Sequence, residues 1–285
     1  MTDIPGDVVA SRNAAVAATD QNSGDLAGQE YWDDLYEPVG GVSAGWKPTT
    51  YGSVAMARQF DRTIRQARPA SILEIGCGNS VWLPYLASQY GFTKVAGMDY
   101  SQPGCELAQQ RLKAQGVAGE IYCRDLWTTS PEEVGQYDFV YSMGVVEHFT
   151  DTKACLEAIM KFVAPGGVLF TSVPNYYRSI HGCVARFWNP SVWRRHNPLG
   201  TKALSEFYSA VGMDDICVKH VGALSLGIVS WMVEPRFPLL AKVLVPAISV
   251  SDRVLGKLLL AMRLYRGLPA LAPYVVAIAK RPAWT

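Results

Sequence analysis

The sequence predicts an α/β protein with a doubly wound, seven-stranded and mostly parallel sheet. Between residues 71 and 173, short apolar segments alternate with longer segments of helical periodicity, which is typical of parallel strands connected by helices. The chain has 285 residues, of which 49% are hydrophobic and 18% charged, so it is long enough to bury one large core.

The elements follow one another in a regular order. A helix is expected over 51–67, because the pattern is helical and Pro69 follows its end. After residues 174–198, which look irregular, Gly212 is expected to end a further helix. The predicted strands are 72–75, 94–98, 120–123, 139–142, 168–173, 215–220 and 274–279, and the other predicted helices are 81–90, 104–115, 152–163 and 201–211.

The segments outside this alternation differ from it in composition. Residues 1–28 are rich in Ala, Ser, Asp and Gly and lack periodic apolar positions, which predicts a mobile N-terminal tail. Residues 29–68 are expected to form an N-terminal helical segment, and residues 69–222 plus 274–285 the α/β core. Residues 223–273 contain more apolar and basic residues than a loop requires, so we expect an inserted helical subdomain between the last two strands.

Composition also argues against several classes of protein. The apolar stretch 237–250 is interrupted by Lys242 and Pro246, so no membrane span is expected. The acidic start does not resemble a secretion signal, and the six cysteines form no C-x-x-C pair, which together predict a cytoplasmic protein with free thiols. The net charge of +1 lacks the broad basic excess of a nucleic-acid binder.

Two strand ends carry candidate binding residues. The first predicted strand runs into Gly76-Cys77-Gly78, a turn whose small residues let the backbone approach a ligand closely. A dinucleotide fingerprint would need a third glycine at position 81, which is Val, so a dehydrogenase is disfavoured. The second strand ends at Asp99, where a carboxylate can accept both hydroxyls of a ribose.

Later segments complete an ordered set. They are Arg124-Asp125-Leu126, the fourth strand with its continuation through Glu147-His148, and Ala164-Pro165-Gly166-Gly167. In this order, the set resembles the class I S-adenosylmethionine-dependent methyltransferases. The resemblance covers about half of the chain, namely residues 72–175, 201–222 and 274–282.

The resemblance implies that the core binds S-adenosylmethionine and releases S-adenosylhomocysteine, and that residues 29–68 form a lid over this cofactor. It implies that Asp99 holds the ribose, that Tyr100 packs on the adenosine, and that Asp125 and Leu126 contact the adenine. The other implied cofactor residues surround the methionine and sulfonium end: Glu74, Gly76, Cys77, Gly78, Ser80, Ser142, Met143 and Gly144.

Catalytic and substrate residues are less constrained by the sequence. His148 and His196 are the candidate general bases, with a structural role beside the cofactor or in a solvated loop as the alternative for each. The substrate-binding candidates are Trp46, Asn175, Tyr176 and Tyr177, which could equally serve packing. No His, Asp and Glu cluster has metal-ligand spacing, so no metal is predicted.

The resulting hypothesis is a methyltransferase that acts on an oxygen or nitrogen of a small metabolite or natural-product intermediate. The alternative is a lipid-linked or glycan acceptor at a membrane surface, and an inactive cofactor-binding scaffold is a third possibility. Residues 251–266 form a basic, amphipathic pattern, which leaves three roles open for the insert. These are peripheral membrane or lipid contact through 237–266, a cover for the active site, and a homodimer interface.

Overall fold

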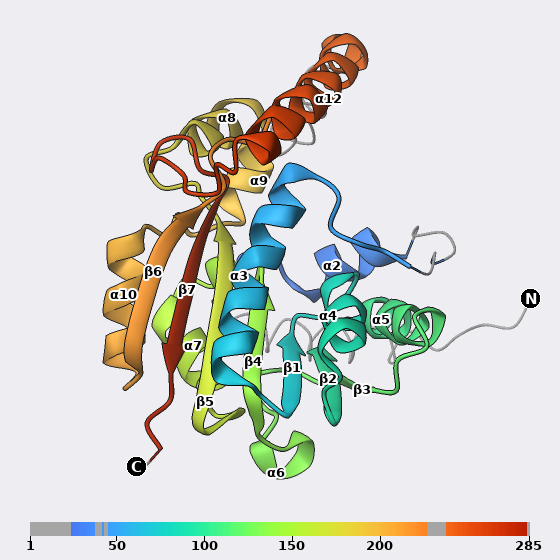
Figure 1. The fold of residues 1–285 in the computed structure, drawn as a ribbon, viewed down its shortest axis with the longest axis vertical. Coiled ribbons are helices and arrows are strands. Elements are labelled where there is room, and N and C mark those ends of the chain that lie inside the picture. Colours follow the sequence, from blue (N-terminus) through green and yellow to red (C-terminus); the bar gives the residue numbers. More distant parts are fainter. Residues whose placement is uncertain (1–23, 38–41, 43–44, 227–237, 284–285) are drawn as a thin grey trace, which may run out of the picture.

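The computed structural model describes residues 24–37, 42, 45–226 and 238–283, so most of the predicted tail, 1–28, lies outside the described residues. Its centre is a seven-stranded sheet of order β3-β2-β1-β4-β5-β7-β6 (Figure 1). Only β7 runs antiparallel to its neighbours, which confirms the doubly wound, mostly parallel sheet. The strands are β1 (Ser71–Ile75), β2 (Lys94–Asp99), β3 (Glu120–Cys123), β4 (Tyr137–Met143), β5 (Val163–Pro174), β6 (Asp214–Val221) and β7 (Tyr274–Lys280).

Helices lie on both sides of the sheet and cluster at one of its ends (Figure 1). The described helices are α2 (Gln29–Tyr36), α3 (Tyr51–Ala67), α4 (Trp82–Tyr90), α5 (Gln102–Ala114), α6 (Pro131–Val134), the 3-10 turn η1 (Val146–His148), α7 (Thr152–Met160), α8 (Ile180–Trp188), α9 (Pro190–Arg194), α10 (Thr201–Ala210) and α12 (Pro238–Ala261).

The sheet is buried on both faces. On one face, α3 and α4 pack against the strands, with Phe60 of α3 stacked on Phe170 of β5 at 4.4 Å between ring centroids. On the other face, Leu156 of α7 and Tyr208 of α10 join a second apolar cluster. Burial on both faces is why the strands are near-continuous apolar runs instead of alternating ones.

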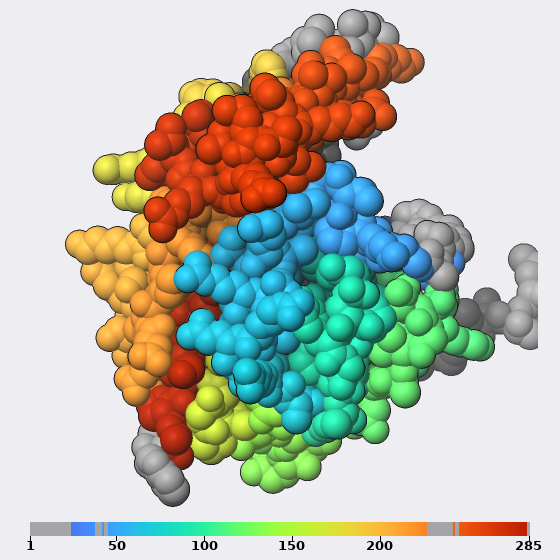
Figure 2. Space-filling view, in the orientation of Figure 1, coloured from blue at the N-terminus to red at the C-terminus, as the bar shows by residue number. Residues whose placement is uncertain are grey.

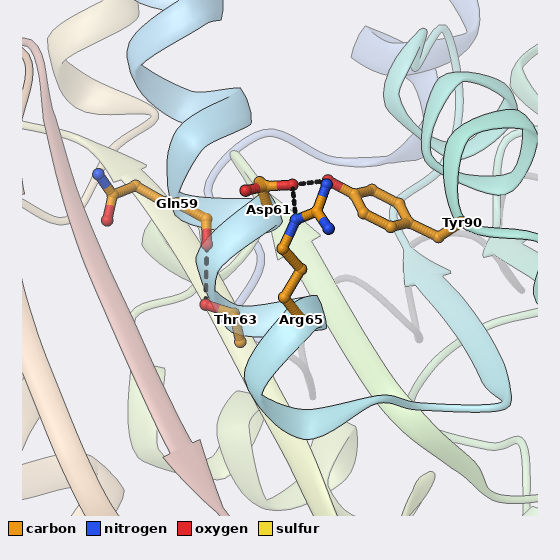
Figure 3. Close-up of polar contacts among 5 residues, drawn as sticks. All are labelled: Gln59, Asp61, Thr63, Arg65 and Tyr90. Atoms are coloured by element: carbon orange, nitrogen blue, oxygen red, sulfur yellow. Dashed lines mark hydrogen bonds and ion pairs between the residues drawn. The ribbon is translucent and has the colours of Figure 1, made fainter.

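Polar contacts fix α3 at both ends. Its first turn is closed by a capping box between Thr50 and Ser53. Farther along, Asp61 accepts hydrogen bonds from Arg65 Nε at 2.6 Å and from the Tyr90 hydroxyl at 2.9 Å (Figure 3). Because Tyr90 belongs to α4, this carboxylate connects two of the helices that cover one face of the sheet.

The segment 174–198, predicted as irregular, contains two short helices, so that prediction was wrong. Ser179 accepts from Gly182 N at 3.1 Å and begins α8, and Asn189 accepts from Val192 N at 3.2 Å and begins α9. α9, with five residues, is too short to show a helical period, and the capping residues of both helices are also common in loops.

The insert between the last two strands contains one long helix, α12, which projects from the body of the molecule (Figures 1 and 2). It crosses the start of α3 at Gly256, where an added Cβ would lie 3.0 Å from Tyr51 Cβ. Asp252 ties its middle to the preceding segment by accepting from Leu226 N at 2.6 Å. Within the described residues, no helix is long and apolar enough to cross a membrane.

Candidate functional site

A cavity of about 580 Å³ opens at the carboxyl ends of β1, β2 and β4. Ten of the residues proposed from the sequence line it: Gly76, Asp99, Tyr100, Asp125, Leu126, Met143, Gly144, His148, Tyr176 and, from the loop after α9, His196. Open α/β sheets bind their ligands at this edge. A larger, more open groove of about 1440 Å³ runs along α3 and the β6–β7 edge, away from these strand ends, so we assign the site to the smaller cavity.

The glycine turn after β1 folds back over β2. Gly76 has φ +73°, and an added Cβ there would lie 2.5 Å from Val145 Cγ2, so only glycine fits. Gly76 N donates to Met98 O at 2.8 Å, and Gly78 N donates to Asp99 Oδ2 at 2.9 Å. The turn and the end of β2 therefore form one rigid unit at the cavity wall.

Asp99 is the charged group at the centre of this unit. Its Oδ1 accepts from Ser101 N at 2.9 Å, and each carboxylate oxygen keeps a further lone pair for a ligand hydroxyl. Burial raises the pKa of this carboxyl to about 6. At neutral pH it is therefore ionised and able to accept two hydrogen bonds.

The cavity wall next to Asp99 is formed by Tyr100 and by the loop after β3. Leu126 is buried, and Asp125 Oδ1 accepts from Trp127 N at 2.9 Å, which fixes the loop after β3. Tyr100 is held by the N-terminal segment: its hydroxyl donates to Asp25 Oδ2 at 2.8 Å, and its carbonyl accepts from Gln29 Nε2 at 3.0 Å.

The segment predicted as a lid contributes to the cavity. Trp32 and Tyr36 of α2 line it, and the Trp32 ring lies edge-on to His148 at 5.0 Å between centroids. Tyr36 covers the glycine turn, since an added Cβ on Gly78 would lie 2.5 Å from its hydroxyl. Residues 24–28 of the predicted tail also lie here, with Leu26 N donating to His148 O at 2.7 Å.

Two imidazoles meet at the far end of the cavity, with ring centroids 4.4 Å apart. His148 Nδ1 lies 2.7 Å from Arg195 O, and His196 Nδ1 lies 2.7 Å from Val192 O. Because a carbonyl oxygen only accepts, each Nδ1 carries the proton and each Nε2 keeps a free lone pair. Burial lowers the pKa of His148 to about 3 and also lowers that of His196, so both rings are neutral at pH 7.

Several residues that the sequence proposed lie outside the cavity lining. Trp46 packs edge-on against Trp82 and Tyr85 of α4. Asn175 is fully buried and donates to Pro269 O and Ala272 O, while Tyr177 is about half exposed. The rest lie behind the wall or in the turn: Glu74, Cys77, Gly78, Ser80 and Ser142.

The sequence interpretation also missed residues that line the cavity, above all Glu147. This side chain is 2% exposed, and its sequence neighbour His148 was the only signal for it. Asp25 and Trp127 also line the cavity without having been proposed. Gln29, Trp32 and Tyr36 line it as parts of the segment that was expected to form a lid.

Glu74, beneath the glycine turn, makes stability depend on pH. Its side chain is 1% exposed, and burial raises its pKa to about 8. The folded protein therefore holds a proton between about pH 5 and 8 that the unfolded chain releases, so this group's contribution to the free energy of unfolding declines as pH rises through that window. We expect Glu74→Gln to remove this contribution. Urea unfolding at pH 5.5, 7 and 8 measures it, and parallel profiles for the wild type and the variant would contradict it.

Comparison with known proteins shows which family the chain resembles. A family model described as a methyltransferase domain matches residues 72–167. The ubiquinone biosynthesis O-methyltransferase of Rhizobium leguminosarum bv. trifolii is 32% identical over 130 residues, 44% of this chain and 50% of that protein. The norajmaline N-methyltransferase of Rauvolfia serpentina is 28% identical over 151 residues, 50% of this chain and 49% of that protein. The chain thus matches about half the length of these two relatives.

A solved structure shares the fold. The plantazolicin methyltransferase BpumL, in complex with a triazolic desmethylPZN analog and SAH, superposes with a TM-score of 0.53. The sequence identity is 15%, and the superposition covers 89% of each chain. At this identity the similarity establishes the fold alone.

Proposed function

Because the chain carries a class I S-adenosylmethionine-dependent methyltransferase domain, we propose that the protein transfers a methyl group from S-adenosylmethionine to an oxygen or nitrogen of a small metabolite or natural-product intermediate. One observation carries this proposal. The cavity leads from the Asp99 carboxylate at one end to two neutral imidazoles at the other, so a nucleoside and a nucleophile can be held in one space.

The residues present fit the cofactor. Asp99 has free lone pairs for the ribose hydroxyls. Leu126 offers an apolar surface and Tyr100 an aromatic ring to the adenine, with Asp125 beside them as an acceptor for its amino group. Gly76, Met143 and Gly144 lead toward the imidazoles, where the sulfonium would point. Since Tyr36 stands over Gly78, we propose that α2 shifts when the methionine end binds.

Methyl transfer depends more on positioning the two reactants and excluding water than on a strong acid or base. The cofactor supplies an activated methyl group, and an acceptor atom held in line at about 3 Å attacks its carbon. Trp32 and Tyr36 line the cavity from α2 and limit the access of water to it. An acceptor hydroxyl can pass its proton to a free imidazole Nε2, for which His148 and His196 remain our candidates. His196 is the stronger base of the two, because burial lowers the pKa of His148 to about 3.

The test is transfer of a radiolabelled methyl group from S-adenosylmethionine into fractions of a cell extract. Label in a polar or weakly apolar metabolite supports the small-molecule acceptor, and label with lipid mobility supports a lipid-linked one. If S-adenosylhomocysteine binds but no fraction takes up label, the protein is a cofactor-binding scaffold and the proposed activity is wrong.

A specific observation favours a membrane surface as a partner. One row of apolar residues along α12 and just past its end faces solvent: Val250, Val254, Leu258 and Met262 are 51%, 65%, 55% and 58% exposed. The exposed Arg253, Lys257 and Arg263 lie beside it, and α8 at the same end of the molecule adds Phe187 and Trp188 (Figure 1). An apolar stripe flanked by cations matches the interface of an anionic bilayer. We propose that the protein docks there from the cytoplasm, where its six cysteines stay reduced.

Sedimentation with vesicles containing anionic lipid tests this docking. We expect the double variant Val254→Asp with Leu258→Asp to bind at least about tenfold more weakly, because two exposed apolar side chains that would enter the bilayer are lost and two negative charges are added. Lys161→Glu on the opposite part of the molecule changes the net charge equally and is the control. Equal sedimentation of the double variant and the control, or a stable dimer with no vesicle binding, would contradict membrane docking.

A further inference from the structure

Three potential metal ligands converge at the inner end of the cavity. Glu147 and His148 belong to η1 after β4, and His196 follows α9. One ligand atom from each of the three side chains lies within 4.8 Å of the others. Ligand atoms around a tetrahedral first-row metal lie about 3.4 Å from one another, so these side chains would close by about 1 Å to hold an ion.

Glu147 supplies the buried carboxyl group of this cluster. Its side chain is 2% exposed, and neither carboxylate oxygen has a hydrogen-bond partner among the described residues. The described ion pairs do not include it either. A buried carboxylate in this state is costly unless a cation or donor reaches it.

The two imidazoles are oriented as metal ligands usually are. Each Nδ1 proton is held by a backbone carbonyl at 2.7 Å, Arg195 O for His148 and Val192 O for His196. This leaves Nε2 as the ligand atom in both rings and fixes the ring planes. A backbone carbonyl on the second nitrogen is a common way in which proteins orient a coordinating histidine.

The backbone around the cluster is fixed as well. Asn197 N donates to Glu147 O at 2.6 Å, and Asn197 Nδ2 donates to Thr152 Oγ1 at 3.2 Å. The neighbouring cation, Arg195, places its guanidinium 4.3 Å from the centroid of the Tyr31 ring, and its charge adds to burial in lowering the pKa of both imidazoles. The backbone that carries the three side chains is therefore held by hydrogen bonds, with one cation near it.

We propose that Glu147, His148 and His196 bind a divalent first-row transition metal, with zinc as the reference ion. Two imidazoles and one carboxylate are a ligand set used for zinc and for non-haem iron, and such a set leaves positions open. These positions face the cavity, which Tyr176 and Gly144 also line. Resting on the proposed function, we infer that the open positions receive an oxygen of the methyl acceptor and orient it toward the sulfonium.

The first test is metal binding by the full-length, chelator-treated protein. Calorimetric titration with Zn²⁺ is expected to show one site, and Co²⁺ titration an absorption spectrum of nitrogen-ligated cobalt. Glu147→Gln and His196→Ala are each expected to weaken Zn²⁺ binding by about 100-fold, since each removes one of three ligands. His220→Ala, a histidine of β6 outside the cluster, is the control and is expected to bind Zn²⁺ as the wild type does.

The outcomes separate this inference from the proposed function. Failure of the wild type to bind Zn²⁺ and Co²⁺, or equal binding by Glu147→Gln and the control, would overturn the metal site. S-adenosylhomocysteine binding is measured in the same samples and is expected to persist without metal, because its proposed contacts lie at Asp99 and Asp125. If Glu147→Gln does not fold, the Co²⁺ spectrum of the wild type and His196→Ala still decides the question.

Discussion

Replacing Asp99 with alanine is expected to weaken the binding of S-adenosylhomocysteine by about 100-fold or more. Two hydrogen bonds from ribose hydroxyls to a charged, buried carboxylate contribute about 1.5 to 3 kcal/mol each, and every 1.4 kcal/mol corresponds to a factor of ten. The same carboxylate holds Gly78 N and Ser101 N, so its loss also loosens the glycine turn. Calorimetric titration with S-adenosylhomocysteine measures the effect.

Two variants separate binding from a general loss of structure. Asp99→Asn keeps an oxygen for one backbone amide and is expected to fall between the wild type and Asp99→Ala. Asp61→Ala removes a carboxylate from α3, whose partners are Arg65 and Tyr90, and is expected to leave affinity unchanged. Full affinity in Asp99→Ala would show that the ribose lies elsewhere.

His196→Ala is expected to lower kcat by about 100- to 10,000-fold, the usual range for the loss of a group that acts on a transferring proton. The loss is expected whether Nε2 accepts the proton itself or holds the proposed metal. Affinity for S-adenosylhomocysteine is expected to stay within about threefold of the wild type, because His196 lies at the opposite end of the cavity from Asp99. Steady-state kinetics and calorimetry on the same preparation measure both quantities.

His196 is a better choice for this test than His148, whose ring also contacts Trp32 of the lid at 5.0 Å. His220→Ala serves again as the control for loss of an imidazole elsewhere. If His196→Ala keeps the wild-type kcat, neither imidazole chemistry nor the metal at this end takes part in the reaction, and His196 serves only the packing of its loop.

Most of the sheet could be predicted because buried parallel strands and amphipathic helices leave clear periods in the sequence. The helix 51–67 and the strand 120–123 were placed at the bounds that the structure shows. The segment 174–198 could not, because α9 has only five residues and because α8 and α9 follow Ser179 and Asn189, residues equally common in loops. Short helices of this kind depend on tertiary packing.

The site also contains residues that the sequence predicted and residues that it did not. The ends of β1 and β2 were recognisable because a ligand approaching the backbone there requires glycine and an acidic residue at fixed spacing, as at Gly76 and Asp99. For Trp46 the sequence does not distinguish a substrate contact from packing on a helix. In the structure, its ring packs against Trp82 and Tyr85 of α4. The meeting of Glu147 with His196 depends on how the chain after β5 folds back, which no spacing in the sequence encodes.

The central claim is that one cavity holds the nucleoside at Asp99 and presents the sulfur to the imidazoles. A crystal structure of the protein with S-adenosylhomocysteine tests it most directly. We predict ribose hydroxyls on the Asp99 carboxylate, the adenine between Leu126 and Tyr100, and the sulfur atom facing His148 and His196, with Tyr36 moved from Gly78. A ligand bound outside this cavity, or a sulfur atom turned away from both imidazoles, would contradict the account.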